Sequence, residues 1–234
     1  LVRAYLRSHG DHIEAMRLLA RIGVAREVLD DAEALLARVL ELAPDYHPAR
    51  VEYAQVLAQR HLFLEARNQA ERLLAVDPDN RGYRTLHALT LVGLGQHEQA
   101  LRLYRELLAG AAQPAELHLS IAHSLKTLGD TTAAVAEYRA ATSARPGYGE
   151  AYWSLANLKT YRFTDEEIGR MRAAEAAPEA SAADRYHLCF ALGKALEDQG
   201  EYEQSFRYYD RGNAGKRAAG DYSAQTLENG ARLQ

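Results

Sequence analysis

The sequence predicts an all-α solenoid of antiparallel helix pairs, and three observations lead to this fold class. Small and apolar residues recur with a period of 34 residues, and four such frames follow one another without a gap over residues 13–148. Alanine and leucine are abundant, and the 234 residues include only six prolines, a composition that favours helices. Gly95 and Gly129 recur at the same place in their frames, between two helical patterns, as turn residues do. The chain should therefore stack helix pairs and have no single core.

The clearest frame is Ala115–Tyr148, in which two apolar helical patterns flank a turn at Gly129–Asp130 and Pro146 closes the unit. Small residues occupy the positions at which its two helices should cross, Ala122 in the first helix and Ala134 in the second. A larger side chain at such a crossing typically costs about 1–3 kcal/mol, because it overpacks the contact. The period is therefore expected to reflect helix packing.

Shifting this frame along the chain gives the expected organisation, in order. Residues 1–12 form a partial repeat that has only its second helix, and residues 13–148 form four regular repeats. Residues 149–185 form an irregular repeat with a long turn, and residues 186–219 return to the regular frame. Residues 220–234 form either a terminal helix or a linker to a missing domain.

The irregular repeat carries a helix-start signal of its own. Its long turn is expected at Thr160–Thr164. Thr164 and Glu167 have the spacing of a capping box, in which each side chain accepts a hydrogen bond from the backbone of the other. This spacing predicts that the next helix begins at Asp165.

Composition and charge argue against several classes of function. The net charge of −4 disfavours nucleic-acid binding, because such proteins present a basic surface. The sequence has no run of 18 apolar residues, so no membrane span is expected. The single cysteine, Cys189, cannot form an internal disulfide, which fits a reducing cytoplasm. The chain begins at Leu1 in mid-pattern, without Met or an apolar signal core, so we interpret it as a fragment of a longer protein.

No motif in the sequence predicts catalysis or a metal site. Residues Gly212–Arg217 look like a phosphate-binding loop, but Asp210 stands where such a loop has glycine, and no strand precedes it. We expect a helix end there instead, with glycine at the C-cap and basic residues near the negative end of the helix dipole. No two of the nine histidines are four residues apart, so none pair on one helix face as metal ligands.

The spacing Ala134-x3-Tyr138, followed by Pro146, is the second half of the tetratricopeptide signature, and the chain resembles that repeat family. The resemblance implies a right-handed superhelix of helix pairs. Two stretches, Gly149–Phe163 and His187–Asn213, resemble a narrower group within this family. They look like the last repeats of bacterial proteins that join a tetratricopeptide arm to a sulfotransferase domain.

In those proteins the repeats precede a catalytic domain that uses 3′-phosphoadenosine 5′-phosphosulfate. The full-length protein would then use this cofactor. The nucleotide-binding loop of such a domain is not found in these 234 residues. We therefore expect this chain itself to be no enzyme and to hold no cofactor.

The family resemblance also implies a concave groove that the first helix of each repeat lines, at positions 5, 9 and 12 of the frame. These positions hold Arg17, Arg21, Gln55, Leu119, His123, Lys126, Trp153, Asn157, Phe190, Lys194 and Glu197. A subset combines an aromatic platform, polar donors and cations, which suits an extended acidic peptide: His123, Lys126, Trp153, Asn157 and Lys194. The alternative is that Trp153 fills the core between repeats and that the lysines are merely solvated.

Three functional hypotheses remain open from the sequence. The first is a non-catalytic, cytoplasmic interaction scaffold that binds a peptide or protein partner in this groove. The alternative is a substrate-recruiting or dimerising arm of a sulfotransferase whose catalytic domain lies beyond residue 234. The third is self-association into a homodimer through the exposed ends of the array. Neither a nucleic acid nor a membrane is an expected partner.

Overall fold

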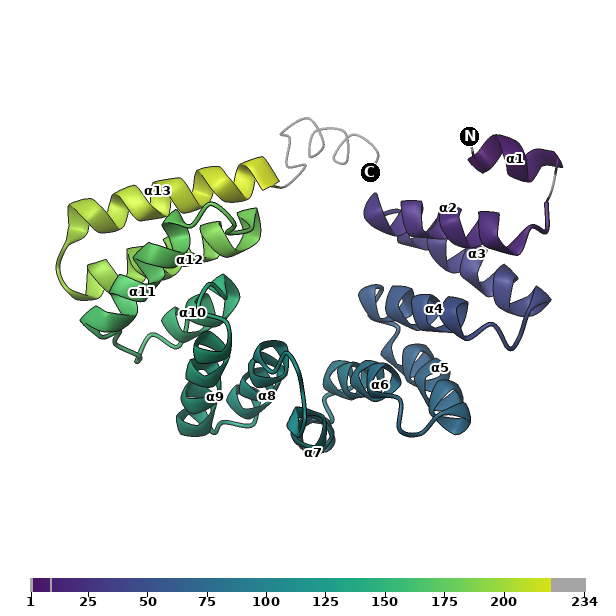
Figure 1. Cartoon of the computed structure of the whole chain (residues 1–234), viewed down its shortest axis with the longest axis horizontal. Coiled ribbons are helices and arrows are strands. Elements are labelled where there is room, and N and C mark those ends of the chain that lie inside the picture. The colour runs from purple at the N-terminus through teal and green to yellow at the C-terminus, as the bar shows by residue number, and fades with distance from the viewer. Residues whose placement is uncertain (1, 9, 220–234) are drawn as a thin grey trace, which may run out of the picture. The chain divides into compact units, whose positions relative to one another are not determined.

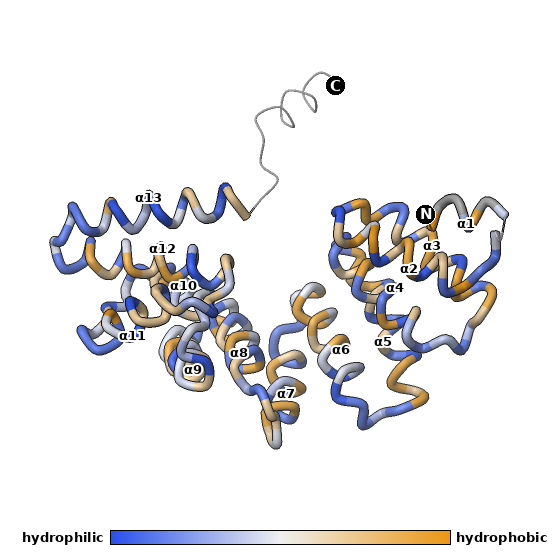
Figure 2. The backbone as a smooth tube through the Cα atoms, turned by 45° about the horizontal axis from the view of Figure 1, so that its top comes forward, coloured by the Kyte–Doolittle hydropathy of each residue, from blue (hydrophilic) through white to orange (hydrophobic). Residues whose placement is uncertain are grey.

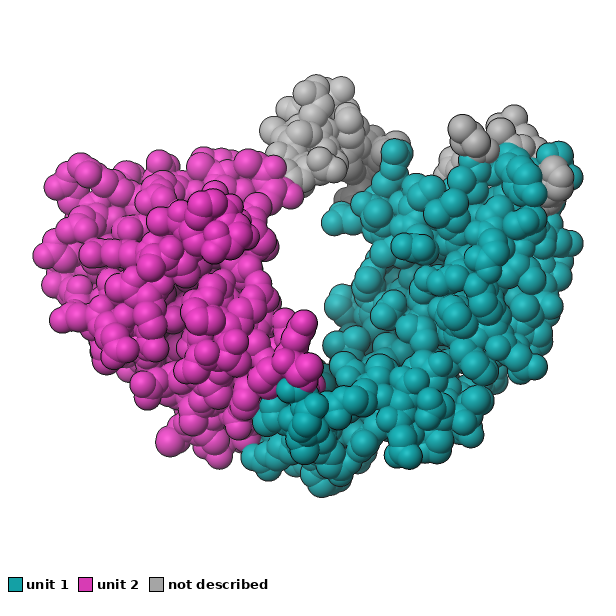
Figure 3. Space-filling view, in the orientation of Figure 1, with its two compact units in different colours: residues 1–111 teal, residues 112–234 magenta. Residues whose placement is uncertain are grey.

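The structure, a computed structural model, describes residues 2–8 and 10–219. These residues form thirteen α-helices and no strand, which confirms the predicted all-α class. Contacts divide the chain into two compact units, Leu1–Ala111 and Ala112–Gln234 (Figure 3). The terminal helix or linker predicted over residues 220–234 lies outside the described residues.

The first unit contains three helix pairs, preceded by one short helix (Figure 1). Within it, α2 packs on α3, α4 on α5 and α6 on α7, and each pair stacks on the next. Its helices are α1 (Val2–Ser8), α2 (Ile13–Ala25), α3 (Leu29–Leu42), α4 (His47–Gln59), α5 (Phe63–Val76), α6 (Arg81–Gly93) and α7 (His97–Leu108). The first helices α2, α4 and α6 each begin at the first residue of a predicted frame.

The second unit contains two close helix pairs, α8 with α9 and α12 with α13, and two helices between them. The intervening helix α10 packs on α9 and α12, and α11 packs on α12. The helices are α8 (Ala115–Thr127), α9 (Thr131–Ala144), α10 (Gly149–Ala156), α11 (Asp165–Ala176), α12 (Ala182–Asp198) and α13 (Tyr202–Ala219).

Alanines at the predicted crossings let the paired helices approach closely. Each of them is completely buried: Ala20, Ala32, Ala54, Ala66, Ala88, Ala100, Ala122 and Ala134. Interiors of this kind are packed as tightly as organic crystals, so the methyl group at each crossing leaves no room for a longer side chain. The 34-residue period is thus a packing period, as expected.

The turns inside the pairs need one residue in the left-handed backbone region. In the α8–α9 turn this residue is Gly129, with φ 87°, and the N–H of Asp130 donates to the carbonyl of Leu125 at 3.0 Å. This is the bond that closes a Schellman motif. Glu27 and His61 take the same place in their own turns with φ 59° and 61°, although neither is glycine. The turn geometry is therefore retained where the glycine is lost.

Helix α10 ends earlier than the sequence predicts. The long turn was expected to begin at Thr160, but α10 ends at Ala156 and the connection to α11 starts at Asn157. Lys159 adopts a left-handed conformation with φ 59°, which no continuing helix permits. The start of α11 at Asp165 agrees with the prediction.

The glycine C-cap expected near Gly212 is wrong, because α13 continues to Ala219, whereas the basic residues expected near the helix end are confirmed, since Lys216 and Arg217 lie in its last turn. Gly212 lies inside α13, is buried, and faces α12. A Cβ atom at this position would lie 2.8 Å from the ring of Phe190 and 3.3 Å from the Cβ of Cys189. Glycine is required here for close helix packing, which a motif-based reading of the local sequence does not reveal. The remainder of α13 is largely hydrophilic (Figure 2).

Candidate functional site

The predicted binding residues of the second unit lie on its first helices, or at the end of one. We call them the α8–α12 face, and they comprise His123 and Lys126 of α8, Trp153 of α10, Asn157 at its C-cap, and Phe190 and Lys194 of α12. Lys126 and Asn157 are exposed, and the other four are half-buried. Spacings of three and four residues place each pair on one side of its helix.

His123 is held in a fixed orientation by α9. The hydroxyl of Tyr138 lies 2.9 Å from Nδ1 of His123, and the two rings meet edge to face with centroids 5.4 Å apart. Burial and, to a lesser extent, the charge of Lys126 lower the pKa of His123, so the imidazole is neutral near pH 7. Ser154 of α10 also interacts with the Tyr138 hydroxyl, which connects His123 to the helix that carries Trp153.

Trp153 packs against the neighbouring first helix and still keeps part of its surface exposed. Its ring lies 5.3 Å from that of Phe190, centroid to centroid, at 43°. Phe190 also covers Gly212 of α13, and its ring lies 6.3 Å from that of Tyr186. The aromatic platform is therefore partly a core contact, as the alternative reading of Trp153 expected, and partly an accessible surface.

Lys194 is not a free cation. Its ammonium group is bonded to Asp198, one turn later on α12. Arg162, from the α10–α11 connection, lies 3.4 Å from the second carboxylate oxygen of Asp198, in an ion pair without hydrogen-bond geometry. The carboxylate thus lies between two cations, and an acidic ligand at Lys194 would compete with Asp198.

Three further residues predicted to line the groove are buried or already bonded to another side chain. Leu119 is only 6% exposed. Arg17 donates to both carboxylate oxygens of Glu52, each at 2.9 Å. Glu197 accepts a hydrogen bond from the hydroxyl of Tyr209 at 3.0 Å. Frame position alone does not show whether a side chain is already engaged.

In the first unit, the structure brings Arg21 of α2 and Gln55 of α4 to the rim of one pocket of about 280 Å³. Gln59, which lies one turn after Gln55 and lines the same pocket, was not predicted. The i, i+4 spacing of the two glutamines on a first helix is the signal that could have found it.

A larger hollow of about 500 Å³ in the second unit was not predicted. It is bordered by the α9–α10 turn, by α11 and by the loop before α12. Its cations already have acidic partners: Arg145 is bonded to Asp184, and Arg170 lies 3.9 Å from Glu166. Glu179, which also lines the hollow, is exposed and adds a negative charge. The hollow therefore has no free cation with which to bind an acidic ligand.

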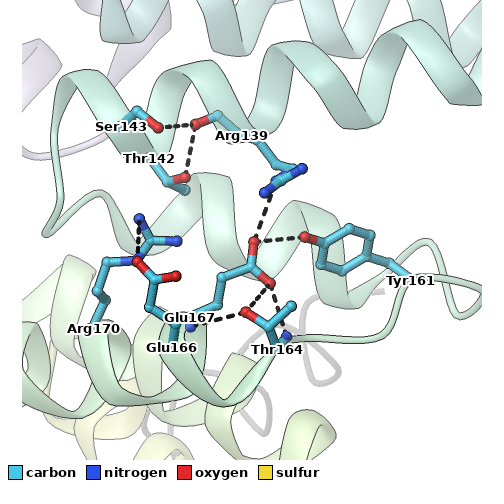
Figure 4. Close-up of polar contacts among 8 residues, drawn as sticks. All are labelled: Arg139, Thr142, Ser143, Tyr161, Thr164, Glu166, Glu167 and Arg170. Atoms are coloured by element: carbon cyan, nitrogen blue, oxygen red, sulfur yellow. Dashed lines mark hydrogen bonds and ion pairs between the residues drawn. The ribbon is translucent and has the colours of Figure 1, made fainter.

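Glu167 organises the polar contacts of the α10–α11 connection (Figure 4). Its side chain is buried, and the residue is 3% exposed. Its carboxylate accepts hydrogen bonds from the hydroxyl of Tyr161 at 2.7 Å and from the backbone N–H of Thr164 at 2.9 Å. Arg139 of α9 lies 3.3 Å away. The predicted capping box is confirmed, because the Thr164 hydroxyl accepts from the N–H of Glu167 in return. These groups satisfy one another, so the cluster is an anchor rather than a reactive centre.

The described residues show no reactive thiol or metal cluster. Cys189 is 2% exposed, and burial, reinforced by Glu175, raises the pKa of its thiol to about 11. A thiol in this state is a poor nucleophile. Residues 2–8 and 10–219 contain no group of His, Cys, Asp and Glu side chains that could bind a metal ion. Within the same residues, no helix is both long and apolar enough to cross a membrane.

Solved structures with the same architecture share little sequence with this chain. TTC0263, a thermophilic tetratricopeptide protein of Thermus thermophilus, is 22% identical, and the match covers 85% of this chain and 97% of that one with a TM-score of 0.56. YrrB, described as a tetratricopeptide protein with an unusual peptide-binding site, is 17% identical over 88% and 96% of the two chains, with a TM-score of 0.52. At these identities the likeness concerns the fold.

Sequence comparisons agree with the structural ones. The Vi polysaccharide export protein VexE of Salmonella typhi is 29% identical over 124 residues, which are 53% of this chain and 19% of that protein. The chain thus spans about a fifth of the length of this curated relative. Models of the tetratricopeptide repeat match residues 24–89, 115–148 and 186–212. Because these stretches make up more than half of the sequence, the chain belongs to the tetratricopeptide repeat family.

Proposed function

We propose that this chain is a non-catalytic scaffold that binds a peptide or protein partner on the α8–α12 face. The observation that carries the proposal is the accessible part of Trp153 together with free polar groups on α8 and at the end of α10. The partly exposed ring of Trp153 packs on Phe190, while Lys126 and Asn157 are exposed and have no side-chain partner in the described part of the chain. Tryptophan is among the residues most enriched in binding hot spots, so this ring is the expected anchor of a partner.

Each of these groups suits one feature of an extended peptide. The amide of Asn157 can both donate to and accept from a peptide backbone. Lys126 can pair with a carboxylate, and the neutral ring of His123 presents its second nitrogen as a hydrogen-bonding group. YrrB, which shares the fold, is described as having a peptide-binding site, and this supports peptide binding by an array of this type.

The test uses an array of immobilised random peptides probed with the whole chain. We expect acidic, extended sequences to be enriched, and we expect the variant with Trp153→Ala and Lys126→Ala to lose affinity for them about tenfold or more. The matched control combines Tyr202→Ala and Lys216→Ala, which remove an exposed aromatic residue and a lysine from α13. Equal losses in the two double variants, or no loss in the first, would show that the face is not the binding surface.

The sulfotransferase-arm hypothesis and homodimerisation stay predictions. The likeness of Gly149–Phe163 and His187–Asn213 to the repeats before a sulfotransferase domain supports the first of them. Reading the gene past the codon for Gln234 tests it. We expect a strand followed by a nucleotide-binding loop, whereas an immediate stop codon would contradict the hypothesis. Light scattering at high protein concentration tests the second, and a mass of one chain would contradict it.

A further inference from the structure

The pocket between α2 and α4 in the first unit has an apolar floor and a polar rim. Leu36 of α3 and Val56 of α4 form the floor and are 1% and 2% exposed. The rim carries Arg21 and two glutamines, Gln55 and Gln59. Its volume of about 280 Å³ is just below the range of roughly 300–1,000 Å³ that is usual for small-molecule sites. A single side chain therefore fits this pocket better than a complete cofactor.

The rim has an excess of positive charge. Glu52 also lines the pocket, but its carboxylate is held by Arg17 with two hydrogen bonds of 2.9 Å. An arginine and a carboxylate interact most strongly in this bidentate arrangement, and here the two charges cancel. Arg21, one helical turn after Arg17, is exposed and has no partner among the described residues. Its guanidinium group is thus available to an anion that enters the rim.

The two glutamines add neutral hydrogen-bonding capacity beside this cation. Gln55 and Gln59 are exposed on successive turns of α4, and their amides have no partner among residues 2–8 and 10–219. Each amide can donate and accept, as the backbone of a peptide does. The pocket therefore combines an apolar cavity, one free guanidinium and two groups that match a main chain.

We propose that this pocket binds one aliphatic side chain of a peptide, of leucine or isoleucine size, next to a carboxylate that pairs with Arg21. The inference rests on the proposed function, because it names the class of peptide, but it concerns a site in the other unit. The carboxylate is that of an acidic side chain adjacent to the aliphatic residue. A C-terminal carboxylate has the same charge, and the experiment distinguishes it from an acidic side chain.

Fluorescence anisotropy with the whole chain tests the proposal, with short labelled peptides in a glycine-serine background. One peptide carries leucine followed by glutamate and ends in an amide, and another ends in leucine with a free carboxylate. The reference peptides are variants of the first peptide, with glutamate replaced by glutamine or leucine replaced by alanine. We expect the first peptide to bind about tenfold tighter than both references and than the peptide with the C-terminal carboxylate. If it does not, including the case in which none binds, the proposal is wrong.

Two variants locate the binding. Arg21→Ala should remove the preference for the carboxylate, whereas Arg26→Ala should not, because Arg26 is an equally exposed arginine that does not line the pocket. Ala25→Phe places a ring at the pocket wall and should abolish the preference for leucine over alanine. Equal losses for Arg21→Ala and Arg26→Ala would overturn the proposal.

A third variant separates this inference from the proposed function. The variant with Trp153→Ala and Lys126→Ala leaves the first unit untouched and should bind the leucine peptides normally. If this variant binds the leucine peptides normally but no longer binds the immobilised acidic peptides, both sites exist. If the leucine peptides fail and the α8–α12 face still binds acidic peptides, only the pocket proposal falls. Loss of the leucine peptides in this variant would assign their binding to the second unit and contradict the pocket.

Discussion

The second unit contains two different kinds of connection after the first helix of a repeat, one between α8 and α9 and one between α10 and α11. Between α8 and α9 the turn is short, the two helices pack along each other, and Gly129 supplies the left-handed residue. Between α10 and α11 the connection runs from Asn157 to Thr164, and α11 packs against α12 instead. The first connection needs only Gly129 and the Asp130 cap of α9, whereas the second depends on the buried carboxylate of Glu167 (Figure 4).

The difference shows what a repeat needs once it leaves its regular spacing. In the α8–α9 pair, Ala122 and Ala134 are completely buried and let the helices approach closely. The polar contact of Tyr138 with His123 joins residues within the two helices. A longer connection leaves backbone and hydroxyl groups without helical partners, and buried polar groups are costly unless they are hydrogen-bonded. Glu167 meets this need, because it accepts from both the hydroxyl of Tyr161 and the backbone of Thr164.

The largest expected effect is therefore at Glu167. We predict that Glu167→Ala lowers the free energy of unfolding by about 3 kcal/mol, because the Tyr161 hydroxyl and the Thr164 N–H lose their acceptor. Arg139 is more than half exposed, so its lost ion pair contributes little. Urea denaturation of the whole chain measures the change.

The neighbouring residue provides the control for this prediction. Glu166 lies on the same turn of α11, but its side chain is 82% exposed and its nearest ion pair, with Arg170, spans 3.9 Å. Glu166→Ala should change the free energy of unfolding by no more than about 0.5 kcal/mol. Similar shifts for the two variants would show that general charge, and not the buried contacts, stabilises the connection.

The second prediction concerns the alanine crossing of the regular pair. Ala134→Leu should cost about 2 kcal/mol, because a fully buried position must accommodate three more carbon atoms. Ala136→Leu is the matched control on the exposed side of α9 and should change stability little. The thermal midpoints of the two variants give the comparison. An unchanged midpoint for Ala134→Leu would contradict the packing explanation of the period.

This comparison also explains how much of the fold could be predicted. Steric requirements repeat along the chain, so Ala122, Ala134 and the positions of the paired helices follow from the period. The capping box at Thr164 and Glu167 is local, and its spacing is visible in the sequence. The bond from Tyr161 to Glu167 depends on the path of an irregular connection, which no period determines.

The candidate site was predictable to a smaller extent, for a related reason. Frame positions place His123 and Trp153 on first helices, but they do not reveal which side chains are already engaged. Lys194 was expected to bind a ligand, yet Asp198 holds it, although their i, i+4 spacing is visible in the sequence. Gly212 was assigned to a helix end because it is a glycine followed by basic residues, whereas its role is set by close packing on Phe190 of another helix.

The third prediction compares turns that have glycine with those that have lost it. Gly129→Ala places a side chain at φ 87° and should cost about 1 kcal/mol. Glu27→Gly, at the equivalent position with φ 59°, should stabilise the chain by up to about 1 kcal/mol. Opposite signs in urea denaturation would support one shared turn geometry. Destabilisation by Glu27→Gly would show that the Glu27 side chain makes a contribution that outweighs its backbone strain.

The smallest expected effect is the response of the α8–α9 pair to acid. Burial lowers the pKa of His123 below its ordinary value of 6.5, so the unfolded chain binds more protons than the folded one near pH 6. Stability is therefore fully present above pH 6.5 and decreases as the pH falls through that value. His87 and His187, whose pKa values burial also lowers, contribute with the same sign.

His123→Asn should flatten this acid dependence, because asparagine does not titrate and its oxygen can still accept from the Tyr138 hydroxyl. Thermal midpoints measured from pH 8 down to pH 5 give the slope for each variant. His61→Asn, at an exposed turn position that tolerates asparagine, is the control for replacing an imidazole by an amide. If His123→Asn has the same slope as the unmodified chain, the imidazole is accommodated equally well in its charged form. The proposal that His123 presents a neutral ring to a ligand would then need revision.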